Sequence, residues 1–180
     1  MTSSPPTDVG RLKQIVPSAL CLTCDVCCRF PEETSFLAPF FMREEISRLD
    51  SAGGPFFPSP HGSRIKLVHH GDGCICPYFD PVTQYCGIYA DRPLDCRLYP
   101  FALMRDAHGT VVLGLDTKCP YVQAHAQDCQ MVRDTDDVAQ FLESETIAAQ
   151  IVSHPALIGP FQDDVIVLRR LEKINAALAH

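Results

Sequence analysis

The chain has 180 residues and 46% apolar content, which is enough for one domain with an ordinary core. Its formal net charge is −7 and it has no basic stripe with interleaved aromatic residues, so we expect no nucleic-acid partner. No stretch approaches the roughly 20 apolar residues of a membrane span, so we expect no membrane partner either.

Ten cysteines are many for a cytosolic chain, where thiols are usually metal ligands, catalytic groups or small core residues. Before the first of them, the segment RLKQIVPSALC carries Lys13 and Gln14, which interrupt the apolar run of an export signal. We therefore expect a cytoplasmic protein with reduced thiols rather than a secreted disulfide protein.

In the first half of the chain the predicted elements are short. Residues 1–8, MTSSPPTD, are expected to be disordered, and residues 9–16 to form one or two helical turns before a proline. A surface helix is predicted from Arg43 to Ser51, followed by a loop in PFFPSPHGSR. Residues 64–70, RIKLVHH, alternate and predict a strand.

The second half is predicted to begin with a hairpin and end in helices. Residues 109–117 predict a strand, with the hairpin turn at His108-Gly109. One helix is expected from Asp134 to Val152, capped by Asp134 or Thr135, and a second from residue 163 to the C-terminus. The fold class predicted is α+β: a small, compact, cysteine-rich, metal-centred domain (9–130) with short strands, and two C-terminal helices (131–180) packed on it.

The cysteines themselves carry the strongest pattern. Cys21, Cys24 and Cys27 form two successive C-x2-C steps, and each such step supplies two thiolates from a single turn. This run resembles the opening of bacterial ferredoxin motifs. The next cysteine, Cys28, directly follows Cys27, so these two side chains are expected to point in different directions.

Downstream cysteines occur in settings that suit the same task. Cys76 and Cys119 each precede a proline, which stiffens the chain behind a ligand. Cys96 lies in ADRPLDCRLYP, where Asp91 is predicted to cap a helical turn that a proline ends.

Arg92 and Arg97 flank Cys96 and are candidate cofactor-binding residues, because guanidiniums offset the negative charge of a thiolate cluster. For Arg92, an ion pair with Asp95 that does nothing for a metal is an equal alternative.

The pattern begins with C-x2-C-x2-C-C. It continues with C-P-x-F, then C-x-I-Y-x-x-R-P-x-x-C-R-x-Y/F-P-F, and ends with a strand followed by C-P. As a whole it resembles the cysteine-cluster family called CxxCxxCC or YkgJ-like, a zinc- or iron-chelating domain. The resemblance covers roughly residues 21 to 120. The residues that carry it are Cys21, Cys24, Cys27, Cys28, Cys76, Pro77, Phe79, Cys86, Ile88, Tyr89, Arg92, Pro93, Cys96, Arg97, Tyr99, Pro100, Phe101, Cys119 and Pro120.

This resemblance implies a metal or iron-sulfur site. A flagellin lysine methylase carries the motif within a longer chain, but no glycine-rich nucleotide loop occurs here, so we do not carry its activity over. Eight cysteines could form two four-ligand sites or one site with spare thiols. The metal ligands expected are Cys21, Cys24, Cys27, Cys28, Cys76, Cys86, Cys96 and Cys119.

Outside the motif, Cys74 and Cys129 are interpreted as small core residues or semi-exposed thiols, and His69 and His70 as ordinary strand histidines rather than ligands. An exposed carboxylate is the commoner reading of Asp116, although it could support a ligand.

The cofactor expected is an iron-sulfur cluster, [4Fe-4S] in the first instance, with a redox or cluster-supported role on a protein or redox partner. Zinc is the alternative, as the staple of a non-catalytic interaction module, and a C-x2-C redox pair of Cys21 and Cys24 is a weaker third hypothesis. No catalytic triad, Walker loop or paired-carboxylate motif is evident, so no enzyme class is assigned.

Overall fold

The computed structural model describes residues 12–49, 54–57, 59 and 61–179. Its architecture is α+β, as predicted, with helices and short strands alternating along the chain. The N-terminal half contains α1 (Ser18–Cys21), η1 (Val26–Cys28), β1 (Arg29–Phe30), β2 (Phe40–Phe41), α2 (Arg43–Leu49), β3 (Ser63–Arg64), β4 (Val68–His70), β5 (Gly73–Ile75), β6 (Phe79–Asp80), β7 (Tyr85–Cys86), η2 (Tyr89–Asp91) and α3 (Leu94–Leu98).

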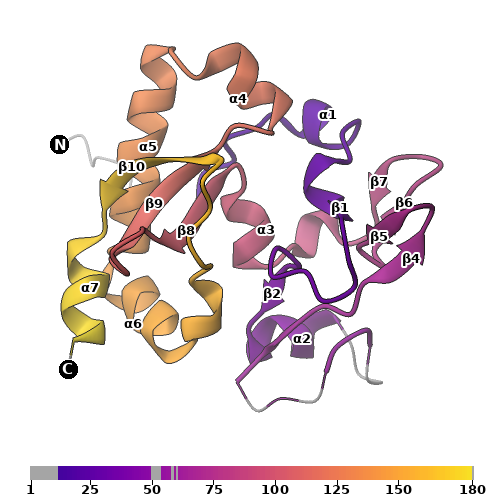
Figure 1. The fold of residues 1–180 in the computed structure, drawn as a ribbon, viewed down its shortest axis with the longest axis horizontal. Coiled ribbons are helices and arrows are strands. Elements are labelled where there is room, and N and C mark those ends of the chain that lie inside the picture. Colours follow the sequence, from indigo (N-terminus) through magenta and orange to yellow (C-terminus); the bar gives the residue numbers. More distant parts are fainter. Residues whose placement is uncertain (1–11, 50–53, 58, 60, 180) are drawn as a thin grey trace, which may run out of the picture.

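Longer elements make up the C-terminal half. They are β8 (Phe101–Arg105), β9 (Val111–Asp116), α4 (Pro120–His125), α5 (Cys129–Leu142), α6 (Glu145–Ser153), η3 (Pro155–Leu157), β10 (Val165–Arg170) and α7 (Glu172–Leu178). The strands form an antiparallel sheet in the order β10-β9-β8. Figure 1 shows this sheet with α5, α6 and α7 on one side of the molecule, the short strands on the other, and α3 between them.

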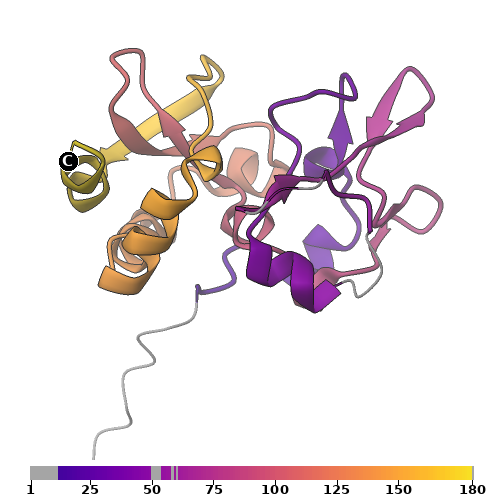
Figure 2. The ribbon, with the colours of Figure 1, turned by 90° about the horizontal axis from the view of Figure 1, so that it is seen from below.

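Side chains pack into two main hydrophobic clusters. The major core joins the β8-β9 hairpin to α4–α7, α3 and residues 12–16. The minor core lies under β1 and β3–β6 and includes Cys74 and Cys76. Among the described residues the minor core has ten buried members against twenty-four in the major core. We call β1 and β3–β7 the short-strand lobe, and Figure 2 shows this lobe beside the longer C-terminal elements.

Strand β2 connects the two clusters. Successive side chains of a strand point to opposite faces, and here Phe40 packs in the major core while Phe41 packs in the minor core. Phe41 also meets Phe56 edge to face, with ring centroids 4.9 Å apart. The two halves of the chain are thus joined by packing as well as by covalent connection.

The hairpin predicted around His108-Gly109 is confirmed. Strand β9 occupies most of residues 109–117 and pairs with β8. Gly109 has φ +82°, a conformation that favours glycine. The Asp106 carboxylate accepts backbone hydrogen bonds from His108 (2.8 Å) and Thr110 (2.9 Å), so the turn is fixed by its own residues.

Two expectations about the N-terminal half need correction, and one is confirmed. Residues 64–70 are not one strand, because β3 pairs with β2 while β4 pairs with β5. The helix predicted at 43–51 is confirmed as α2, and its last two predicted residues lie outside the described part of the chain, as do residues 1–8 and the first three residues of the turn predicted at 9–16. Residues 12–16 contain no helical turn. They run extended into the major core, and a proline follows.

The C-terminal helices also differ from prediction. Residues 134–152 belong to two helices, α5 and α6, separated at Ser144, and α5 begins after Asp128 rather than at Asp134. Residues 165–170 form strand β10 instead of a helix, and α7 starts at Glu172. The run VIVLRR suits a strand because its first three residues are β-branched, and pairing with β9 outweighs the helical periodicity of the run.

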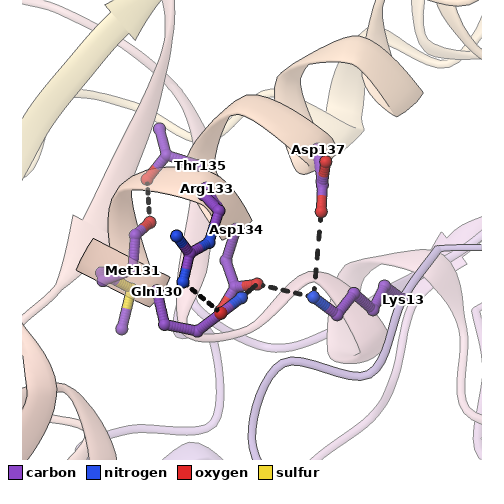
Figure 3. Close-up of polar contacts among 7 residues, drawn as sticks. All are labelled: Lys13, Gln130, Met131, Arg133, Asp134, Thr135 and Asp137. Carbon is purple, nitrogen blue, oxygen red and sulfur yellow. Dashed lines mark hydrogen bonds and ion pairs between the residues drawn. The ribbon is translucent and has the colours of Figure 1, made fainter. Parts of the chain in front are cut away.

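Asp134 lies on α5, and its carboxylate is buried and paired (Figure 3). Its carboxylate accepts hydrogen bonds from Lys13 Nζ at 2.9 Å and Gln130 Nε2 at 2.8 Å. The hydrogen bond to Asp134 raises the pKa of Lys13. This contact fastens the segment that leads into the first cysteines onto the C-terminal helices.

Glu45 is a second buried carboxylate with a positioning role. One oxygen accepts the backbone N–H of Met42 at 2.9 Å, which closes a capping arrangement at the start of α2. The other accepts the N–H of Leu94 at 2.8 Å, at the start of α3. In addition, Asp95 accepts the N–H of Phe40 at 2.8 Å. Helix α3, which carries Cys96, is therefore held by two carboxylates.

Replacing Glu45 by Gln should lower the free energy of unfolding by about 1–3 kcal/mol, because the amide nitrogen would face a backbone N–H and leave one buried donor unpaired. Denaturant unfolding measures this loss. Glu44→Gln is the matched control, since Glu44 is exposed on the same helix and its change should be close to neutral. Equal midpoints for the two variants would contradict the assigned role of Glu45.

Candidate metal centre

The eight cysteines of the motif come from separate elements. Cys21 ends α1, Cys27 and Cys28 lie in η1, and Cys24 lies in the loop between them. The other four follow β5, end β7, lie within α3 and precede α4: Cys76, Cys86, Cys96 and Cys119. All ten cysteines of the chain carry free thiols in the structure.

Four of these thiols influence one another's pKa. Burial raises the pKa of Cys96 well above its usual value, and charges on Asp95, Cys27, Cys76 and Cys86 raise it further. Burial also raises the pKa of Cys76 to about 11, with a further rise from Cys86. For Cys28 the pKa is raised first by its hydrogen bond with Cys27, then by burial, and also by Cys76 and Cys96. We call Cys28, Cys76, Cys86 and Cys96 the first thiol group.

Backbone contacts explain how the short-strand lobe presents this group. The N–H of Cys76 donates to the carbonyl of Cys28 at 3.0 Å, which joins η1 to the end of β5. Strand β6 pairs with β7 through Phe79 and Cys86. The turn after Cys76 closes with a hydrogen bond from Phe79 N–H to its carbonyl at 2.9 Å. Three of the four thiols are therefore set by contacts within this lobe and η1.

Cys119 belongs to a different set of neighbours. Burial raises its pKa, and the charges that raise it further are those of Cys24 and Cys21. Cys119 lies between the end of β9 and the start of α4. The influence of Cys21 and Cys24 on it therefore places the first cysteine loop near this end of the sheet. We call Cys21, Cys24 and Cys119 the second thiol group.

Cys27 lies between the two groups. Its hydrogen bond with Cys28 lowers its pKa, and the guanidinium of Arg92 lowers it further. Cys27 also raises the pKa of Cys21 in the second group and of all four thiols of the first group. The side chains of Cys27 and Cys28 interact directly, so the prediction that they point in different directions is wrong. Cys27 is the remaining motif thiol that can complete the second group.

Arg92 faces both thiol groups. It lowers the pKa of Cys21 and Cys86 as well as Cys27. Its Nη2 donates to Gln14 Oε1 at 3.1 Å, its Nε donates to the Tyr89 carbonyl at 3.1 Å, and its guanidinium stacks 3.8 Å from the Tyr89 ring centre. Asp95 instead accepts the Phe40 N–H, and the cofactor role of Arg92 stays a prediction.

Other sequence predictions have mixed outcomes. Arg97 follows Cys96 in α3 and is half-buried, and its role stays a prediction. The predicted cap of α3 is wrong, because Asp91 ends η2 and Pro93 precedes the helix. Cys74 is buried in the minor core and Cys129 is exposed at the start of α5. The Cys74 thiol lies 3.7 Å from His69 Nδ1.

Two tyrosines near the thiols were given no role in the sequence analysis. The Tyr89 hydroxyl accepts a hydrogen bond from Gln14 Nε2 at 3.2 Å, and Tyr89 lowers the pKa of Cys21. The Tyr99 hydroxyl is buried and has no hydrogen-bond partner among the described residues. Burial raises the pKa of Tyr99, and so do the charges of Asp116, Cys119, Cys27 and Cys24. Both tyrosines lie within the cysteine motif, and this position was the sequence signal that could have suggested a role for them.

The donor chemistry of this region fits a soft metal or an iron-sulfur cluster, because sulfur is the donor throughout and all the motif cysteines except Cys27 are buried or partly buried. Within the described residues, no three His, Cys, Asp or Glu side chains converge closely enough to hold a metal ion. The grouping above therefore rests on which thiols influence one another electrostatically, and bound metal would draw each group together.

A comparison with protein families decides the class. Residues 20–150 match the model of the CxxCxxCC family, described as a putative zinc- or iron-chelating domain. The chain belongs to the CxxCxxCC family. This match confirms the resemblance and supports a metal cofactor in the domain. It extends past the last matched cysteine into α6, so the family domain includes the first two long C-terminal helices.

No curated protein and no solved structure matches this CxxCxxCC chain. Within the described residues, every helix is too short or too polar to cross a membrane.

Proposed function

We propose that this CxxCxxCC protein holds iron-sulfur clusters through its eight motif cysteines, [4Fe-4S] in the first instance, and uses them in electron transfer or in a reaction on a partner protein. The observation that carries the proposal is that all eight thiols belong to one electrostatic network, although they are spread over about a hundred residues of sequence.

The network supports two centres rather than one. Cys28, Cys76, Cys86 and Cys96 would hold the first, and Cys21, Cys24, Cys27 and Cys119 the second. Four thiolates match the ligand number of a cubane cluster. When bound, such a cluster supplies one-electron redox chemistry. The residues of the chain would anchor it, exclude water and, through Arg92, offset its negative charge.

A cytoplasmic location accords with this proposal, because ligation needs reduced thiols. The absence of a basic stripe in the sequence supports a protein or small redox carrier as partner over nucleic acid.

A zinc-stapled interaction module is the second candidate. It is favoured by the size of the minor core, since a lobe of two- and three-residue strands gains little from hydrophobic burial and small domains often rely on a structural metal. All-cysteine sites are common for structural zinc.

Protein purified without oxygen distinguishes the candidates. A broad absorbance near 400 nm, with iron and sulfide in similar amounts, is the expected result for clusters. A colourless protein with stoichiometric zinc would instead establish the staple. Protein that binds neither metal after reconstitution would contradict both.

A further inference from the structure

The Tyr99 hydroxyl is a buried donor without an acceptor in the described part of the chain. Folded proteins rarely leave such a group unpaired, and an exception calls for an explanation such as an ion bound at the site. The Tyr99 ring packs partly buried against the major core, so its hydroxyl cannot reach water unless the ring moves.

The backbone fixes where the ring lies. Tyr99 follows α3 and precedes β8, with an extended conformation of φ −54° and ψ 133°. Next to it, the carbonyl of Pro100 accepts the N–H of Asp116 at 2.9 Å, so Tyr99 is held at the end of β9 from which the chain runs to Cys119.

The charged and ionisable groups that face this hydroxyl come from both sides. The charges that raise the pKa of Tyr99 are those of Asp116 and Cys119 at the end of β9, followed by Cys27 and Cys24 of the first cysteine loop. Three of the four are members of the second centre proposed above. A neutral thiol is a weak acceptor, whereas a thiolate bound to metal is a strong one.

We propose that Tyr99 donates its hydroxyl hydrogen bond to a sulfur ligand of the centre built from Cys21, Cys24, Cys27 and Cys119. This inference rests on the proposed function, and it assigns Tyr99 as a positioning and tuning residue rather than a ligand. The hydroxyl is satisfied when the centre is occupied, and unpaired when the thiols are protonated.

A hydrogen bond to sulfur withdraws electron density from the metal and stabilises the more negative state of a cluster. Removing it therefore lowers the reduction potential. In a zinc centre, the same loss makes the bound thiolates more nucleophilic, so they react faster with an alkylating reagent.

The test compares Tyr99→Phe with Tyr85→Phe in the full chain. Both substitutions delete one phenolic oxygen and keep the ring, but Tyr85 is half-exposed on β7 and should be neutral. Iron, sulfide and zinc content are measured first. Unchanged content in Tyr99→Phe is expected, because the hydroxyl is not a ligand.

The second step depends on the metal found. With iron-sulfur protein, we expect a lower reduction potential in Tyr99→Phe and the wild-type value in Tyr85→Phe. With zinc protein, we expect alkylation by iodoacetamide to be several-fold faster in Tyr99→Phe alone. Equal values in all three proteins would overturn the role of Tyr99 while leaving the metal centre intact.

Stability of the metal-free protein gives an independent check. Since the hydroxyl has no partner without metal, metal-free Tyr99→Phe should unfold at the same denaturant concentration as wild type or a higher one. A clear decrease would show that the hydroxyl bonds to the protein itself and would overturn the proposal. A wild-type chain that binds no metal would instead remove the proposed function on which the inference rests.

Discussion

Replacing Cys24 or Cys86 by Ser should each remove about half of the bound metal, and replacing both should remove nearly all of it. The reason is that the two residues belong to different thiol groups, and a hydroxyl is a far poorer ligand than a thiolate for iron-sulfur clusters or zinc. Binding free energies for structural zinc reach roughly 10–16 kcal/mol, so losing one of four ligands has a large effect. Metal analysis with the visible spectrum measures the outcome.

Cys129→Ser is the matched control for these substitutions. Cys129 is exposed at the start of α5 and lies outside the motif, so its variant should keep the full metal content and spectrum. If both motif variants retained all their metal and colour, the ligand assignment would be wrong. If either one lost all of it, a single shared centre would replace the two proposed here.

Removing the metal should unfold the short-strand lobe and spare the β10-β9-β8 sheet. The lobe consists of strands of two or three residues on the minor core, and three motif cysteines, Cys28, Cys76 and Cys86, lie in or directly beside it. The sheet has strands of five and six residues on the major core. Stability that is unevenly distributed in this way permits local unfolding.

Hydrogen exchange of metal-bound and chelator-treated protein measures this difference. Amides of β4 to β7 should lose about a hundredfold or more of their protection, or roughly 3 kcal/mol of opening free energy, whereas amides of β9 should change little. Uniform loss of protection in both regions would show instead that the two cores unfold as one cooperative unit. Full retention in β4 to β7 would show that metal does not stabilise the lobe.

Features with local causes were predictable from the sequence. The β8-β9 hairpin follows from Asp106, whose carboxylate caps its own turn, and from Gly109, which tolerates a positive φ. Helix α2 has the acidic first turn, Glu44 and Glu45, that the sequence predicts for it. The family was predictable because the spacing of the cysteines alone identifies it, without knowledge of the fold.

Features that depend on distant partners were missed. Strand β10 shares its residues with a plausible helix pattern, and its pairing with β9 involves residues about fifty positions away. Asp134 looked like a helix cap, but its burial depends on Lys13, 121 residues earlier. The break between α5 and α6 did have a local signal, since Ser144 followed by Glu145 is a common helix start.

The grouping of the cysteines could not be read from their spacing. We group Cys21 and Cys24 with Cys119 because the first cysteine loop lies near the end of β9. We group Cys96 with Cys28 and Cys76 because hydrogen bonds of Glu45 and Asp95 hold α3 against α2 and β2. Both arrangements arise from tertiary contacts. The motif predicted the candidate ligands, whereas their grouping depends on the fold.

X-ray absorption at the edge of the metal found in the purified protein tests the central claim, that cysteine thiolates hold the metal, most directly. The account predicts a first coordination shell made of sulfur alone, at about 2.3 Å, with an additional iron-iron shell if clusters are present. A first shell with nitrogen or oxygen in place of half or more of the sulfur would contradict it.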